Sequence, residues 1–289
     1  MPKIKRVRPT AAPGTDLPDR MDYPSPDGEW KLVFHSPREW HMGADGWQAK
    51  LFHRSREVTA QHDFFKIAGG KGFRWDRDFY PWSFDSKSLV LVTWDKTPVH
   101  LYEIASKSDT QLDYEPGYVR SAQWAPDMDR LLINFTNDGV LVNQSGEQQA
   151  LVQWGIREGE PPHTYWLKTG NSFFLLARQS ANSKTTLTFH SGVDGTAKET
   201  HDLDPLDLVP YRSEDYIELP RDRLSLQWID PPIQSAGSLL DTWNSVRFDR
   251  GSNTLFLAVT RPVSSPYREE GELLCKVEQR WVAVELDPE

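Results

Sequence analysis

The chain has 289 residues, a formal net charge of −9 at pH 7 and a hydrophobic fraction of only 38%. The negative charge argues against sequence-independent binding to nucleic acid or to an anionic membrane surface, because both need an excess of Lys and Arg. The 12 Trp and 13 Phe residues still supply enough large apolar side chains for a core. We therefore expect a single folded domain, 1–289, rather than a disordered chain.

Other features of the composition exclude further classes of protein. Cys275 is the only cysteine, so an internal disulfide is impossible and a cysteine-rich zinc site is excluded. The basic N-terminus lacks the apolar stretch of a signal peptide, and no apolar run approaches the roughly 20 residues of a membrane span. The simplest expectation is a cytoplasmic monomer without cofactor or metal.

The most informative pattern is a repeat. Trp82, Trp124 and Trp166 follow one another at intervals of 42 residues, and each precedes a polar turn and then an apolar strand. Phe248 has the same internal spacing, 82 residues after Trp166, which is about twice the period. Repetition in register is typical of core positions, so we expect these tryptophans to pack between repeats rather than to bind a ligand.

Within one repeat, residues 118–154, apolar segments alternate with turn signals in a way that predicts four short strands. Four strands in about 40 residues, repeated along the chain, are typical of the blades of a β-propeller. A single four-stranded sheet cannot bury both faces, so blades stack face to face around an axis. We predict an all-β fold consisting of one β-propeller.

The number of blades depends on residues 200–240, which hold no clear copy of the turn. We interpret them as a degenerate blade, which favours six blades; five blades plus an insertion is the alternative. The chain stops just after what should be the third strand of the last blade. Residues 1–21 form an N-terminal arm, and the basic segment 3–8 is the candidate to supply the missing outer strand and close the ring.

The turn at Ser25-Pro26-Asp27-Gly28 has three relatives, which begin at Phe84, Ala125 and Lys168. Together they resemble the repeat of TolB-like or WD-like β-propellers, in which an apolar residue, Ser-Pro-Asp-Gly and an apolar strand follow one another. The resemblance spans about residues 22–286, although only the 25–28 copy matches in full. It implies a fold, which many unrelated functions share.

In propellers of this kind, partners usually bind the face formed by loops that enter first strands and by loops that join second to third strands. Long loops of this type in the first and last blades would become neighbours when the ring closes. The alternative interpretation is that they are ordinary solvated loops. The predicted partner-binding face comprises Arg38, Trp40, His41, Arg77, Arg120, His163, Trp243, Asn244, Arg261 and Tyr267.

Signals for catalysis are weak, and we predict no catalytic residue. A propeller glycosidase would need two carboxylates facing each other near the axis, for which Asp76 or Asp78 with Glu160 are the candidates. The acidic segment 201–207 lacks the spacing of a specific calcium loop.

The expected function is therefore a non-enzymatic protein-binding module, an acidic scaffold or an inhibitor-like or immunity-like protein that opposes a basic partner. The alternatives are a glycan-processing enzyme that uses axial carboxylates and a sensor that binds a small ligand in the central channel.

Overall fold

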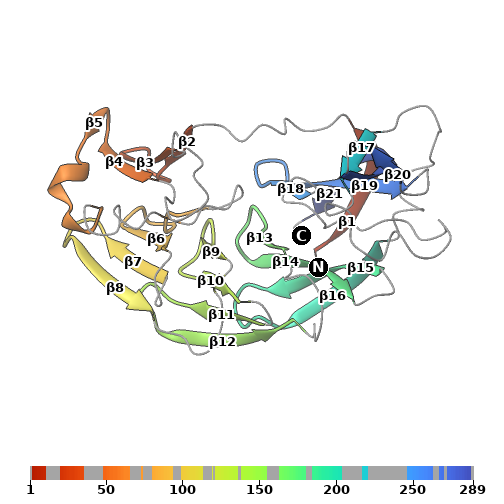
Figure 1. Cartoon of the computed structure of the whole chain (residues 1–289). Helices are drawn as coiled ribbons and strands as arrows, with labels where there is room; N and C mark the ends of the chain where they lie inside the picture. The colour runs from red at the N-terminus through yellow and green to blue at the C-terminus, as the bar shows by residue number, and fades with distance from the viewer. Residues whose placement is uncertain are drawn as a thin grey trace.

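The computed structural model describes residues 2–10, 20–35, 48–65, 73, 80–93, 99–112, 119, 121–135, 138–154, 163–179, 184–203, 217–220, 246–262, 267–269 and 272–287. Within these ranges the chain is almost entirely β-structure, arranged as five sheets that follow one another around an arc (Figure 1). Each sheet is one blade, and its strands run in sequence order from the inner edge outward in the first four blades. The predicted all-β propeller is therefore confirmed.

The first four blades are built from consecutive antiparallel strands. Blade 1 contains β2 (Arg20–Pro24), β3 (Trp30–His35), β4 (Gln48–His53) and β5 (Arg56–Glu57), followed by the 3-10 turn η1 (Thr59–Gln61). Blade 2 contains β6 (Ser88–Val92), β7 (Val99–Glu103) and β8 (Ser108–Leu112). Blade 3 contains β9 (Ser121–Trp124), β10 (Leu131–Asn134), β11 (Asp138–Val142) and β12 (Gln148–Gln153). Blade 4 contains β13 (His163–Trp166), β14 (Ser172–Gln179), β15 (Lys184–Ser191) and β16 (Ala197–Leu203).

Blade 5 is assembled from both ends of the chain. Its sheet runs β1 (Lys3–Thr10), β21 (Glu272–Asp287), β19 (Thr254–Pro262), β18 (Val246–Asp249), and β17 (Ile217–Pro220) and β20 (Tyr267–Glu269) also pair with β21. The N-terminal strand lies antiparallel to β21, with Lys3 opposite Asp287 and Thr10 opposite Trp281. The predicted outer strand of the last blade is thus present, and it hides an edge that would otherwise expose unpaired backbone groups.

The preference for six blades is wrong: the described residues form five, the number that the alternative expected. Blade 4 and blade 5 are direct neighbours, since Lys168 N in the first turn of blade 4 donates to Asn253 Oδ1 in the first turn of blade 5, at 2.8 Å. Of the region 200–240 proposed as a degenerate blade, residues 200–203 end β16, and residues 217–220 form β17, which pairs with β21 instead of starting a sheet. The other residues of this region, 204–216 and 221–240, lie outside the described ranges.

The core lies between blades rather than within one blade. Trp82, Trp124 and Trp166 are fully buried, as expected from their spacing. The indole N–H of Trp82 donates to Tyr23 O of blade 1 at 2.8 Å, and that of Trp166 donates to Gln123 O of blade 3 at 3.0 Å. Trp82 and Trp166 therefore each contribute apolar burial and one hydrogen bond to the neighbouring blade, whereas Trp124 contributes burial alone.

Candidate functional site

The two ends of the ring are built differently. At one end, which we call the turn end, short turns join the first two strands of blades 1, 3, 4 and 5: 25–29, 125–130, 167–171 and 250–253. In blade 2 the equivalent turn, 83–87, joins Trp82, which forms an isolated bridge with Leu89, to β6. At the opposite end, which we call the loop end, second strands such as β3 and β14 end and third strands such as β4 and β15 begin. The segments between strands 36–47, 94–98, 113–118, 155–162 and 204–216 lie outside the described part of the chain.

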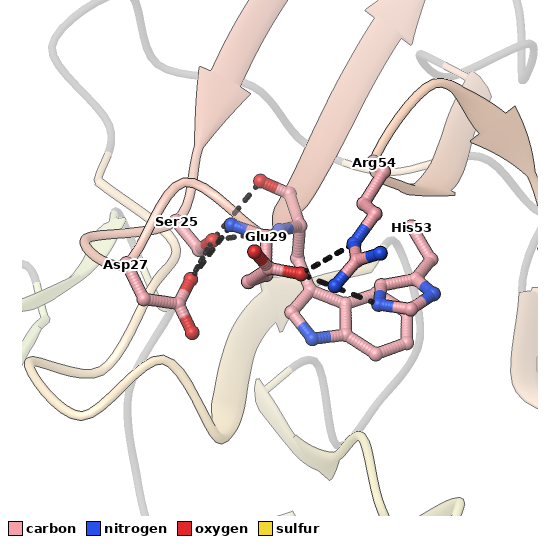
Figure 2. Close-up of polar contacts among 6 residues, drawn as sticks. Ser25, Asp27, Glu29, His53 and Arg54 are labelled. Carbon is pink, nitrogen blue, oxygen red and sulfur yellow. Dashed lines mark hydrogen bonds and ion pairs between the residues drawn. The ribbon is translucent and has the colours of Figure 1, made fainter.

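The turn that resembles the TolB-like motif is held by its own polar groups (Figure 2). Ser25 Oγ donates to Asp27 Oδ1 at 2.6 Å, and the same carboxylate oxygen accepts from Glu29 N at 3.0 Å. Blade 2 repeats the arrangement with Ser83 Oγ and Asp85 Oδ1 at 2.8 Å. The Ser and Asp of the motif therefore close the turn, which is a structural role.

These carboxylates are held in their ionised form. Burial works to raise the pKa of Asp27, but hydrogen bonds from Ser25, Glu29 N and Ser86 outweigh it and leave the pKa below its ordinary value. The pKa of Asp85 is lowered in the same way, with burial outweighed by Ser83 Oγ, Lys87 N and Gln144. Neither group has the raised pKa expected of a general acid at neutral pH.

Contacts between turns join the blades at the turn end. Asp27 N donates to Ser86 Oγ at 3.0 Å, which links blades 1 and 2. Gln144 of blade 3 donates through its side chain to Asp85 Oδ1 at 2.7 Å, which links blades 3 and 2. Much of the polar surface at the turn end is thus already used by internal contacts.

The axis of the ring is crossed near this end. The guanidinium of Arg250, in the first turn of blade 5, lies 4.5 Å from the ring centroid of Tyr80, which precedes the inner strand of blade 2. Blades 2 and 5 are not neighbours around a five-membered ring, so this cation–π contact spans the centre. It places a positive charge and an aromatic ring near the axis of the ring.

On the outer part of the turn end, blade 1 carries a small charged and aromatic group. Glu29 Oε2 accepts from Arg54 Nε at 2.7 Å and lies 3.8 Å from His53 Nε2 (Figure 2). The imidazole of His53 stacks on Trp30, with centroids 4.5 Å apart and planes inclined by 30°. Arg54 is largely exposed and its charge is screened, so this group adds little to stability and leaves no reactive side chain unpaired.

The predicted partner-binding residues belong to the part of the molecule that is least described. Arg38, Trp40, His41, Arg77, Arg120, Trp243 and Asn244 lie outside the described ranges. Arg261 lies in β19, opposite Glu278, and Tyr267 lies in β20, opposite Leu274, but their side chains are not described. His163 starts the inner strand of blade 4 and stacks on Tyr165 with centroids 6.4 Å apart. The grouping of these residues on one face remains a prediction.

Of the candidates for chemistry, Asp76, Asp78 and Glu160 also lie outside the described ranges. In the acidic segment, His201 lies in β16 and faces Glu199, with Nε2 and Oε1 3.2 Å apart. Among the described residues, no group of three His, Cys, Asp or Glu side chains could hold a metal ion. No described helix is long and apolar enough to cross a membrane.

Sequence reasoning missed a buried polar network in blade 2. His100 Nδ1 lies 3.0 Å from Asp109 Oδ2, and its Nε2 lies 3.4 Å from Thr93 Oγ1. His62, after η1, approaches Tyr102 OH through Nδ1 at 2.5 Å, and burial raises the pKa of Tyr102 to about 12. His100, Thr93 and Tyr102 are almost completely buried, so the network joins strands and blades rather than meeting a substrate. Four consecutive residues of β7, Val99 to Tyr102, are buried, and the apolar residues on either side of His100 are the signal that could have found it.

His190 gives a pH-dependent prediction. Its Nδ1 lies 3.0 Å from Gly195 O, its ring stacks on Phe173 at 5.1 Å, and its buried Nε2 has no partner among the described residues. Burial lowers its pKa, and burial likewise lowers the pKa of His62. The unfolded chain therefore binds protons more readily than the native one just below the unfolded pKa of about 6.5. The stability contributed by burying these two histidines in their neutral form is fully present above pH 6.5. It is lost as the pH falls toward the lowered pKa values of His190 and His62 in the folded protein.

We expect the melting temperature to fall between pH 7.5 and pH 5.5, before the carboxylates titrate. The His190→Gln variant should show a smaller fall over the same range, measured by circular dichroism at constant ionic strength. The matched control is His53→Gln at an exposed position, which should keep the wild-type dependence. An unchanged slope in the His190 variant would contradict the prediction.

Comparisons with known proteins give similarity in fold only. No protein-family model and no curated protein sequence matches the chain. Among solved structures, it is similar to hydrazine synthase from Kuenenia stuttgartiensis, with a TM-score of 0.50 and 12% identity, covering 93% of this chain and 64% of that one. It is also similar to TolB from Acinetobacter baumannii, with a TM-score of 0.42 and 13% identity, covering 63% of this chain and 43% of that one.

The matches span less than two thirds of the length of either protein. The five sheets of the described residues agree with the propeller fold that the turn at 25–28 resembles.

Proposed function

We propose that the chain is a non-enzymatic β-propeller that binds another protein through the loop end of the ring. The observation that carries the proposal is the difference between the two ends: every described first turn is short and belongs to the turn end. There, polar groups such as Asp27, Asp85 and Gln144 already have internal partners. A surface that has satisfied its own hydrogen-bonding groups offers a partner little directional recognition.

The loop-end segments have the composition of a binding surface. The segment 36–47 contains Arg38, Trp40 and His41, and the hairpin 254–287 contains Arg261 and Tyr267. Trp, Tyr and Arg are the residues that most often dominate the binding energy of protein interfaces. Loops on a rigid scaffold are also the usual place for such residues.

The chemistry of the partner follows from the charge. The net charge of −9 favours association with a basic protein, whose approach would be accelerated electrostatically. An inhibitor or immunity-like role toward a basic toxin or nuclease is the finer form of this proposal. Its binding should weaken as the salt concentration rises.

The test is affinity capture from the native lysate with three matched proteins: wild type, a loop-end variant (Trp40→Ala with Arg261→Ala) and a turn-end variant (Phe84→Ala with Arg54→Ala). Phe84 and Arg54 are exposed at the turn end, so this variant removes an aromatic and a cation of the same kinds from the other face. We expect one stoichiometric, basic protein with wild type and the turn-end variant, and its loss with the loop-end variant. Binding to the purified partner should weaken at least tenfold.

All three proteins must first show the same melting temperature within about 2 °C, so that lost capture is not lost folding. Capture that survives in the loop-end variant but fails in the turn-end variant would overturn the choice of face. Capture of no stoichiometric protein by any of the three would count against a protein-binding function.

A further inference from the structure

One buried cation has no visible partner. Arg247 lies in β18, the inner strand of blade 5, and only 6% of it is exposed. Within the described part of the chain, none of its Nε, Nη1 and Nη2 atoms has a hydrogen-bond partner. Burial of an arginine is tolerated when its donors are paired, because an isolated buried charge is strongly unfavourable.

The register of the strand shows which way Arg247 projects. The neighbouring residue Phe248 packs against blade 4, with its ring 5.4 Å from Tyr165 and 5.0 Å from Phe174. Successive side chains of a strand point to opposite faces of the sheet. Arg247 therefore projects from the face of blade 5 that is turned away from blade 4, close to the inner edge of the sheet.

The same strand position in blade 3 shows what such a side chain can do. Trp124, Trp166 and Phe248 pair with Leu131, Phe173 and Leu255, so they occupy equivalent positions. Gln123 is then the counterpart of Arg247. It bridges to the next blade, where its Nε2 donates to Thr164 O at 2.9 Å. In blade 5 the neutral amide of Gln123 is replaced by the longer, positively charged side chain of Arg247. A buried guanidinium is stabilised better by an anion than by a neutral carbonyl group.

Two described carboxylates, Asp249 on the same strand and Asp22 on the inner strand of blade 1, already have partners. Asp249 accepts from Gly251 N at 2.9 Å and from Ser252 Oγ at 2.6 Å. Asp22, on the inner strand of blade 1, is paired with Arg20 at 2.7 Å and with Lys31 at 3.1 Å. A second guanidinium, that of Arg250, adds positive charge to the same inner edge, where it lies over Tyr80.

We propose that Arg247 anchors a binding site for a small oxyanion at the inner edge of blade 5. The planar guanidinium presents paired N–H donors that fit a carboxylate or phosphate group bidentately. Such a ligand would supply the missing charge and hydrogen bonds, and it would couple occupancy of the site to stability of the last blade. The proposal concerns a small anion and does not depend on protein binding at the loop end.

The test uses the full chain and two probes, inorganic phosphate and acetate, at constant ionic strength adjusted with chloride. Calorimetry measures saturable binding, and thermal melting measures stabilisation. We expect about one binding site in wild type and, at a hundredfold excess over Kd, a rise in melting temperature on the order of 5 °C. Preference for one probe identifies whether the natural ligand carries a phosphate or a carboxylate.

The matched variants separate specific binding from the general stabilising effect of phosphate, which is excluded from protein surfaces. Arg247→Met should lose the saturable binding, while Arg54→Met, at an exposed arginine paired with Glu29, should keep it. Arg247→Lys retains the positive charge but lacks the paired N–H donors of the guanidinium, so it should bind the anion at least tenfold more weakly. If the Met variant fails to fold, the Lys variant provides the comparison with wild type.

Absence of saturable binding to wild type would overturn the proposal, and would mean that a carboxylate of the chain itself pairs with Arg247. Equal binding by wild type and Arg247→Met would overturn it as well. Because the measurement needs no protein partner, it can fail while protein binding at the loop end succeeds, and the reverse.

Discussion

Removal of residues 1–10 should lower the melting temperature by about 10 °C or cause the protein to aggregate. The strand β1 completes the outer edge of blade 5, from Lys3 opposite Asp287 to Thr10 opposite Trp281. Its Ile4 and Val7 pack on the cluster between blades 4 and 5. The lost burial and hydrogen bonds together amount to about 3–5 kcal/mol. The exposed edge of β21 would also become a template for pairing with other chains.

The matched control for this deletion is the single substitution Arg8→Ala. Arg8 Nε pairs with Glu285 at 3.0 Å on the exposed side of the same strand. A pair of this kind contributes less than about 1 kcal/mol, so the variant should melt within about 2 °C of wild type. A deletion that melts like wild type would show that β1 is dispensable and that the ring closes by another contact.

The Trp166→Ala substitution should lower the free energy of unfolding by about 3–5 kcal/mol. The indole is fully buried between blades 3 and 4, where it stacks edge-on against Phe173 at 5.2 Å and donates to Gln123 O at 3.0 Å. Truncation leaves a cavity and removes a hydrogen bond from a buried backbone carbonyl. Chemical denaturation followed by tryptophan fluorescence measures the change in the free energy of unfolding.

A suitable comparison is Phe84→Ala, because Phe84 is 38% exposed on the turn of blade 2. That variant should stay within about 0.5 kcal/mol of wild type. Equal losses for the two substitutions would contradict the assignment of the repeated tryptophans to the core. A Trp166→Phe variant should recover part of the loss, because it restores apolar volume without the hydrogen bond.

Several features of the fold were predictable because they depend on local chemistry. The Ser25-to-Gly28 turn closes through Ser25 Oγ and Asp27 Oδ1, and both atoms belong to the turn itself. The interval between Trp82, Trp124 and Trp166 reflects the number of residues needed for four strands and their turns. Segment 3–8, the candidate for the outer strand of the last blade, lies in β1 and pairs with β21.

The number of blades was not predictable in the same way. The segment 200–240 is long enough to form a blade, but its strand signals do not show which sheet a strand would join. Whether it forms a blade depends on whether blades 4 and 5 contact each other directly, as Lys168 and Asn253 show that they do. Such a contact joins residues 85 positions apart and leaves no mark in either segment alone.

The candidate sites also divide into those predicted from the sequence and those seen only in the structure. Composition and loop position predicted a partner-binding face, and Arg38, Trp40 and their companions remain a prediction. The buried pairs His100–Asp109 and His62–Tyr102, and the unpartnered Arg247, emerged only from the structure. The residue type of a histidine or an arginine does not indicate whether its side chain is solvated or buried.

The sequence alone predicted the all-β class, the repeat and the turn chemistry, and it offered segment 3–8 as a candidate to close the last blade, because each depends on neighbouring residues or on a regular interval. Only the tertiary structure decided that five blades form the ring, that Arg250 crosses the axis to Tyr80, and that Arg247 is buried. These facts depend on which distant segments share a surface, and the free energy of that packing belongs to pairs of segments rather than to either one.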